Sequence, residues 1–330
     1  MLYLGIDQHS KQLTVDLGNE AGDVVQHQQV KTDFSSLRTF FAKLKQRSEA
    51  EGGFMACLEI CGFNDYLLKE LQEHGCREIV LIQPQKRQSH KSDRRDARGL
   101  RDLLWVHRHA LQSGKRLPGI RRVRLCSAEE AAQRQITSLR KRLGKVRTQT
   151  INRVRRLLRK HNLQHDCPTQ GIATLKARAW LRELCLPEID RVEMDILLQE
   201  WAAVEEQIDR VSAHIKRQQA DSKAAMIVAS MPGMGSYSSL AVGSRIGNPH
   251  DFRRGTSLAN FVGLAPGCNN TGETRRVGSI TKEGSSMIRF ILGQVTLHVL
   301  RKDPWMKKCT PKSNGVAAPK SPASPSCDAW

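Results

Sequence analysis

Short apolar runs alternate with helical apolar repeats through the first hundred residues of the chain. Segments with the length and turn-rich borders of strands lie at Leu2–Ile6, Leu13–Leu17, Val24–Val30, Met55–Ile60 and Glu78–Gln83. Helical spacing predicts helices around 37–44 and 66–71, and a third from Asp93 to about Gln112. Three strands joined by short turns, then two strands separated by helices, predict a mixed α/β sheet in a domain spanning 1–112.

A long apolar stripe with helical spacing, here called the seam, follows this domain. Apolar and small residues step by three or four over 136–157, a spacing typical of a helical hairpin or coiled coil. Pro168 and Gly171 interrupt the pattern, and a second, more acidic repeat runs over 188–211. The two repeats predict an antiparallel coiled-coil arm over 113–222.

A third, mainly α domain is predicted over 223–308, where apolar helical patterns return. The apolar run 226–231 leads into Pro-Gly-Met-Gly, and a second apolar helix follows over 240–246. Two helices joined by a Gly-x-Gly turn can expose backbone N–H groups at a helix start. Gly233 and Gly235 are therefore candidates for phosphate binding in a helix-hairpin-helix-like segment, and a plain helix–helix turn is the alternative.

Charge indicates the class of partner. The chain has 330 residues, a formal net charge of +20 and a sequence pI near 9.9, which favours nucleic acid over a membrane. Sixteen basic residues lie within 115–160 against two glutamates. A solvated face is the alternative, but solvated helices usually interleave acids with bases. We predict that Arg153, Arg155 and Arg156 hold nucleic acid.

Composition also argues against several other classes of protein. No apolar run is long enough to span a bilayer, and no basic leader precedes the first predicted strand, so we expect a cytoplasmic protein. The nine cysteines are scattered without a Cys-x-x-Cys pair, which favours reduced thiols over disulfides or a zinc site. Residues 309–330 are rich in Pro and Ser and are predicted to be disordered.

Four carboxylates stand in unusual settings. Asp7 ends one apolar run, Glu59 interrupts another, and Asp93 and Asp96 share a helix face among cations. If the helix packs over the strand ends, all four acids converge on one site. Oxygen ligands suit Mg²⁺ or Mn²⁺, which can activate a nucleophile and stabilise a leaving oxygen in phosphodiester chemistry. The sequence therefore predicts a metal centre.

Each acid also has a structural explanation. Asp7 precedes polar residues and could belong to a turn. Glu59 could pair with an arginine, since an unpaired buried carboxylate costs several kcal/mol. Asp93 could cap its helix, with Asp96 reinforcing the first turn. All four acids lie in one predicted α/β domain of a basic protein, which favours a metal site over these three structural explanations.

The segments that carry the four acids resemble a known family. These segments are Leu-Gly-Ile-Asp-Gln-His-Ser-Lys (4–11), Leu-Glu-Ile-Cys-Gly-Phe (58–63) and Lys-Ser-Asp-Arg-Arg-Asp-Ala (91–97). They are similar to the Asp-Glu-Asp-Asp tetrad of insertion-sequence 110 (IS110) family transposases, also described as bridge-RNA-guided recombinases. Further similarity lies in 230–235, 261–267 and 277–284, so the resemblance covers residues 1 to about 308.

The resemblance implies a fold and an activity. The fold would be an RNase H-like (RuvC-like) catalytic domain, a coiled-coil arm for assembly into a dimer or tetramer, and a C-terminal transposase domain. The activity would be excision and integration of a mobile DNA element, with a structured RNA as guide. The family's nucleophilic serine would fall on residue 271, which here is Thr271. Threonine keeps the hydroxyl, but its methyl group crowds attack on phosphorus.

Basic residues near these motifs are candidates for contacts with the nucleic-acid backbone. Those beside the predicted metal centre are Arg94, Arg95 and Arg98, and those near Thr271 are Arg275, Arg276 and Lys282.

Past residues 303–305 the chain departs from the family pattern. Relatives continue into a basic helical stretch, whereas this sequence runs into a Pro/Ser-rich segment, so we expect an altered terminus. Two alternatives to a transposase therefore stay open. One is a metal-dependent junction resolvase or nuclease, and the other is a catalytically impaired nucleic-acid-binding remnant.

Overall fold

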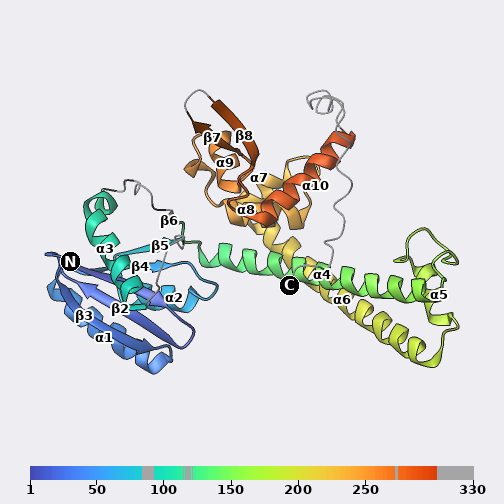
Figure 1. Ribbon diagram of the computed structural model, residues 1–330, viewed down its shortest axis with the longest axis horizontal. Helices are drawn as coiled ribbons and strands as arrows, with labels where there is room; N and C mark the ends of the chain where they lie inside the picture. The colour runs from blue at the N-terminus through green and yellow to red at the C-terminus, as the bar shows by residue number, and fades with distance from the viewer. Residues whose placement is uncertain (84–92, 114, 116–119, 121, 272–273, 303–330) are drawn as a thin grey trace. The chain divides into compact units, whose positions relative to one another are not determined.

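The computed structural model describes residues 1–83, 93–113, 115, 120, 122–271 and 274–302, with the side chains of 112 and 268–277 left out (Figure 1). The chain divides into two compact units, Met1–Leu125 and a second that begins at Cys126. The predicted boundaries, 112/113 and 222/223, differ from this division. The predicted tail, 309–330, lies outside the described residues.

The first unit is built on a six-stranded mixed sheet, which confirms the predicted α/β class. Its strands are β1 (Leu2–Gln8), β2 (Gln12–Gly18), β3 (Val24–Lys31), β4 (Phe54–Glu59), β5 (Glu78–Ile82) and β6 (Arg122–Val123). The order is β3-β2-β1-β4-β5-β6, with β1, β4 and β5 parallel and the others antiparallel to their neighbours. This arrangement is compatible with an RNase H-like fold. The two-residue strand β6 was not predicted, and it extends the unit beyond residue 112.

Helices cover both faces of this sheet, because its central strands β1, β4 and β5 are apolar on both sides (Figure 1). Leu2, Leu4 and Ile6 of β1 face a core that includes α1 (Phe34–Ala50) and α2 (Asp65–Glu73). The alternate residue Tyr3 belongs to a second core with Leu100 and Leu104 of α3 (Asp93–Gln112). Side chains alternate along a strand, so Gly5 and Asp7 share the α3 face with Tyr3.

Helix α3 lies directly on β1 at Gly5. A Cβ at this position would overlap the carbonyl oxygen of Ala97 and approach the backbone N of Arg101. The close approach of helix and strand therefore requires glycine. It fixes the start of α3 near the carboxyl end of β1.

A buried ion pair also holds α3 on the sheet. The guanidinium of Arg101 is 4% exposed, and its Nη1 lies 2.8 Å from Oδ1 of Asp16 on β2, which is 3% exposed. His27 on β3 lies 3.2 Å from the other Asp16 oxygen. Breaking such a pair leaves one charge buried without its partner.

We expect Arg101→Met to lower the free energy of unfolding by about 3–5 kcal/mol, since the Asp16 carboxylate stays buried after its cation is removed. Urea denaturation measures this change. Asp16→Asn combined with Arg101→Met should recover much of the loss. Arg98→Met is the matched control, because Arg98 is exposed and its pair with Asp102 spans 3.8 Å. Equal effects of the two single substitutions would contradict the structural role of the buried pair.

The second unit contains two long helices where the seam was predicted. Helix α4 (Ala128–Lys160) starts at a capping box of Ser127 and Glu130, and it packs against α6 (Glu188–Asp221), with α5 (Leu175–Glu183) between them in sequence. Their shared core contains Val154, Leu157, Leu158, Leu181, Met194, Leu197 and Trp201. The coiled-coil character of the pair stays a prediction. No helix among the described residues has the length and apolar content needed to cross a membrane.

The rest of this unit comprises α7 (Lys223–Ala229), α8 (Ser236–Ile246), the 3₁₀ helix η1 (Pro249–Asp251), α9 (Gly255–Val262), β7 (Pro266–Thr271), β8 (Thr274–Ile280) and α10 (Ser286–Lys302). It is joined to the two long helices through α7 and α8, and α10 packs on α8 and α9. Arg245 of α8 donates to the hydroxyls of Thr137 and Ser138 on α4, each at 2.9 Å. Helix α8 also contacts α6. These contacts explain why the unit continues through residue 222.

Two glycines account for the backbone packing between the 261–267 and 277–284 segments. A Cβ on Gly263 would overlap the carbonyl oxygen of Glu283, and a Cβ on Gly284 would overlap that of Phe261. Both glycines have positive φ, 76° and 106°. The segments on either side of the β7–β8 hairpin therefore meet backbone to backbone.

Candidate metal centre and nucleic-acid interface

The carboxyl end of β1 and the first turn of α3 bring two of the predicted acids together. Asp7 lies near the end of β1 on the α3 face, and Asp93 is the first residue of α3. The close contact at Gly5 holds the helix against this strand. Asp7 and Asp93 therefore meet although they are 86 positions apart in the sequence.

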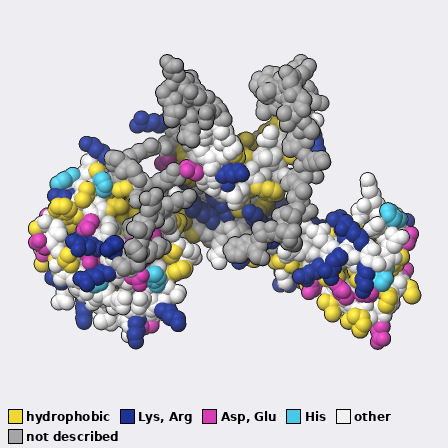
Figure 2. Space-filling model, in the orientation of Figure 1, with side chains coloured by type: hydrophobic (Ala, Val, Ile, Leu, Met, Phe, Trp, Pro, Cys, Tyr) yellow, Lys and Arg dark blue, Asp and Glu magenta, His cyan; other side chains and the backbone are white. Residues whose placement is uncertain are grey.

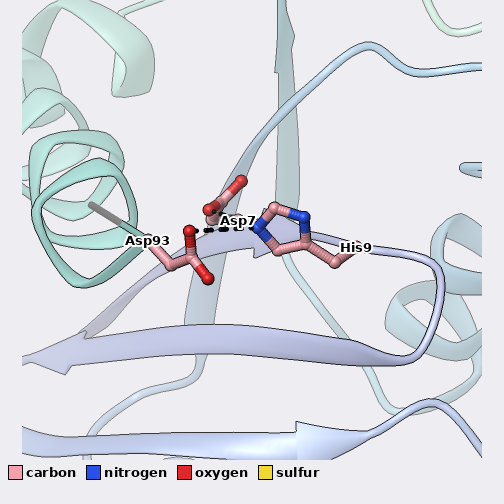
Figure 3. Close-up of side chains that lie close together, drawn as sticks. All are labelled: Asp7, His9 and Asp93. Atoms are coloured by element: carbon pink, nitrogen blue, oxygen red, sulfur yellow. Dashed lines mark hydrogen bonds and ion pairs between the residues drawn. The ribbon is translucent and has the colours of Figure 1, made fainter. Parts of the chain in front are cut away.

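The two carboxylates converge on one imidazole (Figure 3). Nε2 of His9 lies 3.1 Å from Oδ2 of Asp7 and 3.4 Å from Oδ1 of Asp93. One ligand atom from each of these three residues lies within 4.8 Å of the others, a spacing that can hold a metal ion. Asp7 is 20% exposed, whereas His9 and Asp93 are about half exposed. The cluster is thus open to solvent on one side.

The charge of Asp7 is unfavourable in this setting. Burial raises the pKa of Asp7, the imidazole of His9 opposes that rise, and the nearby carboxylates of Asp93 and Asp96 add to it. Asp96 therefore lies close enough to act on the charge of Asp7. Grouped carboxylates that raise the pKa of one member are relieved by a bound cation, and oxygen donors suit a hard divalent ion. The donor set fits Mg²⁺ or Mn²⁺.

Glu59 ends the strand next to Asp7. The parallel register pairs Ile6 with Leu58, and its next step sets Asp7 beside Glu59. Glu59 also shares a strand face with Cys57; burial raises the pKa of that thiol to about 12, and the charge of Glu59 contributes. The strand order thus places the fourth acid at the same end of the sheet, on the α3 face.

His9 was not among the predicted site residues. It belongs to the polar residues after Asp7, for which a turn is the structural alternative to a site, and a turn does lie there, since the backbone N of His9 donates to the carbonyl of Gln12. The short β1–β2 connection turns the imidazole back towards Asp7. The sequence does contain a signal for this role, because His9, an ionisable residue, follows the candidate metal ligand Asp7 by two positions at the end of a predicted strand.

The arginines predicted near this centre lie along the start of α3. Arg94 and Arg95 are exposed in its first turn. Arg98 is also exposed and lies 3.8 Å from Asp102 one turn later. All three are therefore accessible to an approaching polyanion.

The three arginines predicted on the arm have different surroundings. Arg153 lies 3.8 Å from Glu200 and Arg156 lies 4.0 Å from Glu193, both on α6. Arg155 points to another side of α4, where Asn152 accepts from it at 3.5 Å. Because exposed pairs at such distances are weak, they leave the cations available to solvent.

The C-terminal candidates lie on the β7–β8 hairpin and beside it. Thr271 ends β7 in register with Thr274, and Arg275 and Arg276 pair with Asn270 and Asn269. The side chains of these residues lie outside the described part of the chain. Lys282 is exposed with a φ of 56°, and its backbone N donates to the carbonyl of Gly263.

The predicted glycine turn joins α7 to α8. Gly233 has a φ of 85°, and a Cβ there would lie 3.0 Å from the ring of His298. Gly235 precedes α8 at its N-terminus, with no side-chain cap. The start of α8 thus has backbone N–H groups that its capping residue leaves unpaired.

Comparison with known proteins gives a consistent assignment. The family described as "Transposase IS116/IS110/IS902 family" matches residues 225–310, and a second transposase family, of the DEDD IS110 type, matches residues 4–163. The second match includes Asp7, Glu59, Asp93 and Asp96.

Individual relatives extend the same similarity. A "Probable family 20 transposase" of Pseudomonas aeruginosa is 29% identical over 72% of this chain and 69% of its own length. The transposase for insertion sequence element IS1111A of Coxiella burnetii is 26% identical over 71% of this chain and 63% of its own length. The transposase for insertion sequence element IS1328 of Yersinia enterocolitica is 22% identical over 85% of this chain and 81% of its own length.

Proposed function

This chain belongs to the IS110 family of transposases, and on that premise we propose that it cleaves and transfers DNA strands of an insertion sequence in a metal-dependent reaction. The observation that carries the proposal is the convergence of Asp7 and Asp93 at the end of β1. The strand position of Glu59 and the influence of Asp96 on the pKa of Asp7 support it.

We propose that Asp7, Glu59, Asp93 and Asp96 hold Mg²⁺ or Mn²⁺. When bound, the ion supplies Lewis acidity that stabilises negative charge on the scissile phosphate. Nε2 of His9 is within hydrogen-bond distance of Asp7 and lies 3.4 Å from Asp93, so a proton on this nitrogen partly offsets the repulsion between the two acids. His9 is about half exposed, so its ring has room to move away from them.

Basic residues neutralise the backbone around the reacting phosphate. Arg94, Arg95 and Arg98 lie beside the acids on exposed positions of α3 and suit the phosphates next to the scissile bond. Arg275, Arg276 and Lys282 would hold the strand near Thr271. The Thr271 hydroxyl would lose its proton and attack phosphorus, forming a covalent protein–DNA phosphodiester, while one P–O bond to deoxyribose breaks and its oxygen leaves as a protonated hydroxyl. Gly233 and Gly235 would offer backbone N–H groups to a further phosphate.

Partners follow from charge and surface. The net charge of +20 supports binding of DNA and of a structured guide RNA. Ile189, Val192 and Ile196 of α6 are 78%, 52% and 52% exposed. Their spacing puts them along one side of the helix, which supports self-association of the second unit into a dimer or tetramer.

Trapping of a covalent adduct tests the proposed chemistry. We expect Thr271→Ser to raise the yield of protein–DNA adduct in Mg²⁺ about tenfold, since removing the methyl group eases attack by the hydroxyl. Denaturing gels with labelled element-end DNA measure the adduct, and chelation of the metal should abolish it. Thr274→Ser is the matched control, because Thr274 is the cross-strand partner of Thr271.

The alternatives give different results in the same assay. Metal-dependent cleavage without any adduct, in both serine variants, would favour a junction resolvase or nuclease. Salt-dependent binding without cleavage by the wild-type chain or by Thr271→Ser would indicate an impaired nucleic-acid-binding remnant.

A further inference from the structure

A cavity of about 430 Å³ opens where α4 ends and the loop 161–174 leads to α5. It is formed within the second unit by the last turns of α4 and by this loop. Figure 2 shows Lys and Arg side chains, with histidine nearby, gathered over this end of the α4–α6 pair. The volume lies in the range of small-ligand sites.

The floor and the rim of the cavity differ in polarity. Leu158 is 2% exposed and Ile172 is 7% exposed, and together they form an apolar floor. The rim carries the exposed side chains of Arg155, Arg159 and His165. A ligand that fits this arrangement has a flat apolar part and an anionic part.

The two rim arginines are set apart from the acids of α6. Arg153 and Arg156 have glutamate partners on α6, and Lys160 pairs with Asp190 at 2.7 Å. Across the described residues, neither Arg155 nor Arg159 has a carboxylate within ion-pair distance. Positions 155 and 159 are one helical turn apart, so both side chains lie on the cavity side of α4.

The helix dipole explains only part of this arrangement. A cation in the last turn of a helix offsets the partial negative charge of its C-terminus, and Arg159 lies in that turn. Arg155 lies a turn earlier, where the dipole has little influence. A second cation at the same rim therefore requires another explanation.

Internal hydrogen bonds hold the walls of the cavity in place. The hydroxyl of Thr169 donates to the carbonyl of Gly171 at 2.9 Å and lies 2.8 Å from that of Thr174, which caps α5. Asp190 accepts from both Lys160 and His161, which ties the end of α4 to α6. A site shaped before binding loses less entropy when the ligand arrives.

We propose that this cavity binds one unpaired nucleotide of a nucleic-acid strand. Its base would lie on the Leu158–Ile172 floor, and its phosphate would bridge Arg155 and Arg159. Guanidinium groups both stack on bases and donate to phosphate oxygens, and unpaired bases are the usual targets of such pockets. The inference rests on the proposed function for the nature of the ligand, while the cavity shares no residue with the metal centre.

Binding of a bulged duplex tests this site in the full-length chain. Fluorescence anisotropy in chelator compares a fully paired duplex with the same duplex carrying one bulged nucleotide, each made in DNA and in RNA. We expect the wild-type chain to bind the bulged duplex of either DNA or RNA about tenfold more tightly than its fully paired form. A tenfold difference in affinity corresponds to roughly one charge-assisted hydrogen bond. The DNA and RNA forms identify which strand supplies the nucleotide.

Two double variants separate the cavity from general charge. Arg155→Gln with Arg159→Gln should abolish the preference for the bulge. Arg153→Gln with Arg156→Gln removes the same charge from the same helix, and it should weaken both duplexes alike while keeping the preference. Loss of the preference in both doubles, or no preference in the wild-type chain, would overturn the inference.

The thiol of Cys167 gives a second measurement that needs no substitution. Cys167 lines the cavity and is partly exposed, whereas Cys126 and Cys185 are exposed elsewhere. Alkylation of the three thiols is measured by peptide mass spectrometry. Bound bulged duplex should slow the alkylation of Cys167 about tenfold relative to that of the other two thiols. Equal protection of all three would count against the site. Metal-dependent cleavage alongside equal affinity for the two duplexes would overturn this inference and leave the proposed function standing.

Discussion

Asp7→Asn is expected to reduce Mg²⁺-dependent strand cleavage by about a thousandfold, because metal stabilisation of a reacting phosphate supplies several kcal/mol. The amide keeps the size of the carboxyl group but loses its charge and one hard oxygen ligand. Affinity for DNA in chelator should change little, since phosphate binding depends on the arginines. Cleavage rate and binding are measured on the same labelled substrate.

The same substitution should lower cleavage without lowering the stability of the fold. Burial and the charges of Asp93 and Asp96 raise the pKa of Asp7, so its charged form is disfavoured in the folded state. A raised carboxyl pKa means that stability falls as pH rises from the pKa of the unfolded chain through that of the folded state. The amide of the Asp7→Asn variant cannot ionise, and the variant should therefore be at least as stable as the wild type at neutral pH without metal.

Bound metal should make the wild type more stable than the Asp7→Asn variant. Mg²⁺ or Mn²⁺ at a hundred times its dissociation constant raises the stability of a protein that binds it by about 2.7 kcal/mol. The melting temperature of the wild type should rise accordingly, and that of Asp7→Asn should not. Asp23→Asn is the matched control, because Asp23 is an exposed acid of the same unit. Unchanged cleavage in Asp7→Asn, or an equal metal shift in both variants, would remove Asp7 from the mechanism.

Much of the first unit could be predicted from the sequence. Strand-length segments and helical repeats predict the elements from β1 to α3, because the central strands β1, β4 and β5 are covered on both faces and are apolar on both sides. Strand alternation places Asp7 and Glu59 each on one side of its own strand, and their convergence then depends on the helix that packs over the strand ends. The predicted grouping of the acids depends on this periodicity, which is a local property of the chain.

Other features depend on contacts that no local pattern records. The hairpin β7–β8 contains few residues that favour strands, and the segments on either side of it meet at Gly263 and Gly284. Helix α5 follows a loop rich in polar and helix-breaking residues, and its start depends on the hydroxyl of Thr174. His9 joins the acids only because the β1–β2 turn folds it back over Asp7.

Gly5→Ala should have the second largest effect, although it adds a single methyl group. The added Cβ would overlap the Ala97 carbonyl oxygen, which belongs to the backbone of α3 and cannot rotate away. Either α3 lifts from β1 or the strand bends. Overpacking of this kind costs about 1–3 kcal/mol, and more where backbone must move.

The effect on activity should exceed the effect on folding. Lifting α3 separates Asp93 and Asp96 from Asp7, and a displacement of about 1 Å in a catalytic group can lower the rate about a hundredfold. Cleavage is therefore measured per folded molecule, at a temperature where urea denaturation shows the variant to be folded. The metal-induced rise in melting temperature should shrink in parallel, since the ligands no longer converge.

Gly62→Ala provides the control for adding a methyl group to a glycine of the same unit. No atom lies within 4 Å of a Cβ at that position, outside the immediate chain neighbours, so stability and cleavage should both stay near wild type. If Gly5→Ala cleaves normally once folded, the distance between α3 and β1 does not set the geometry of the acids. If both glycine variants lose activity equally, the loss comes from restricting the backbone and not from the contact with α3.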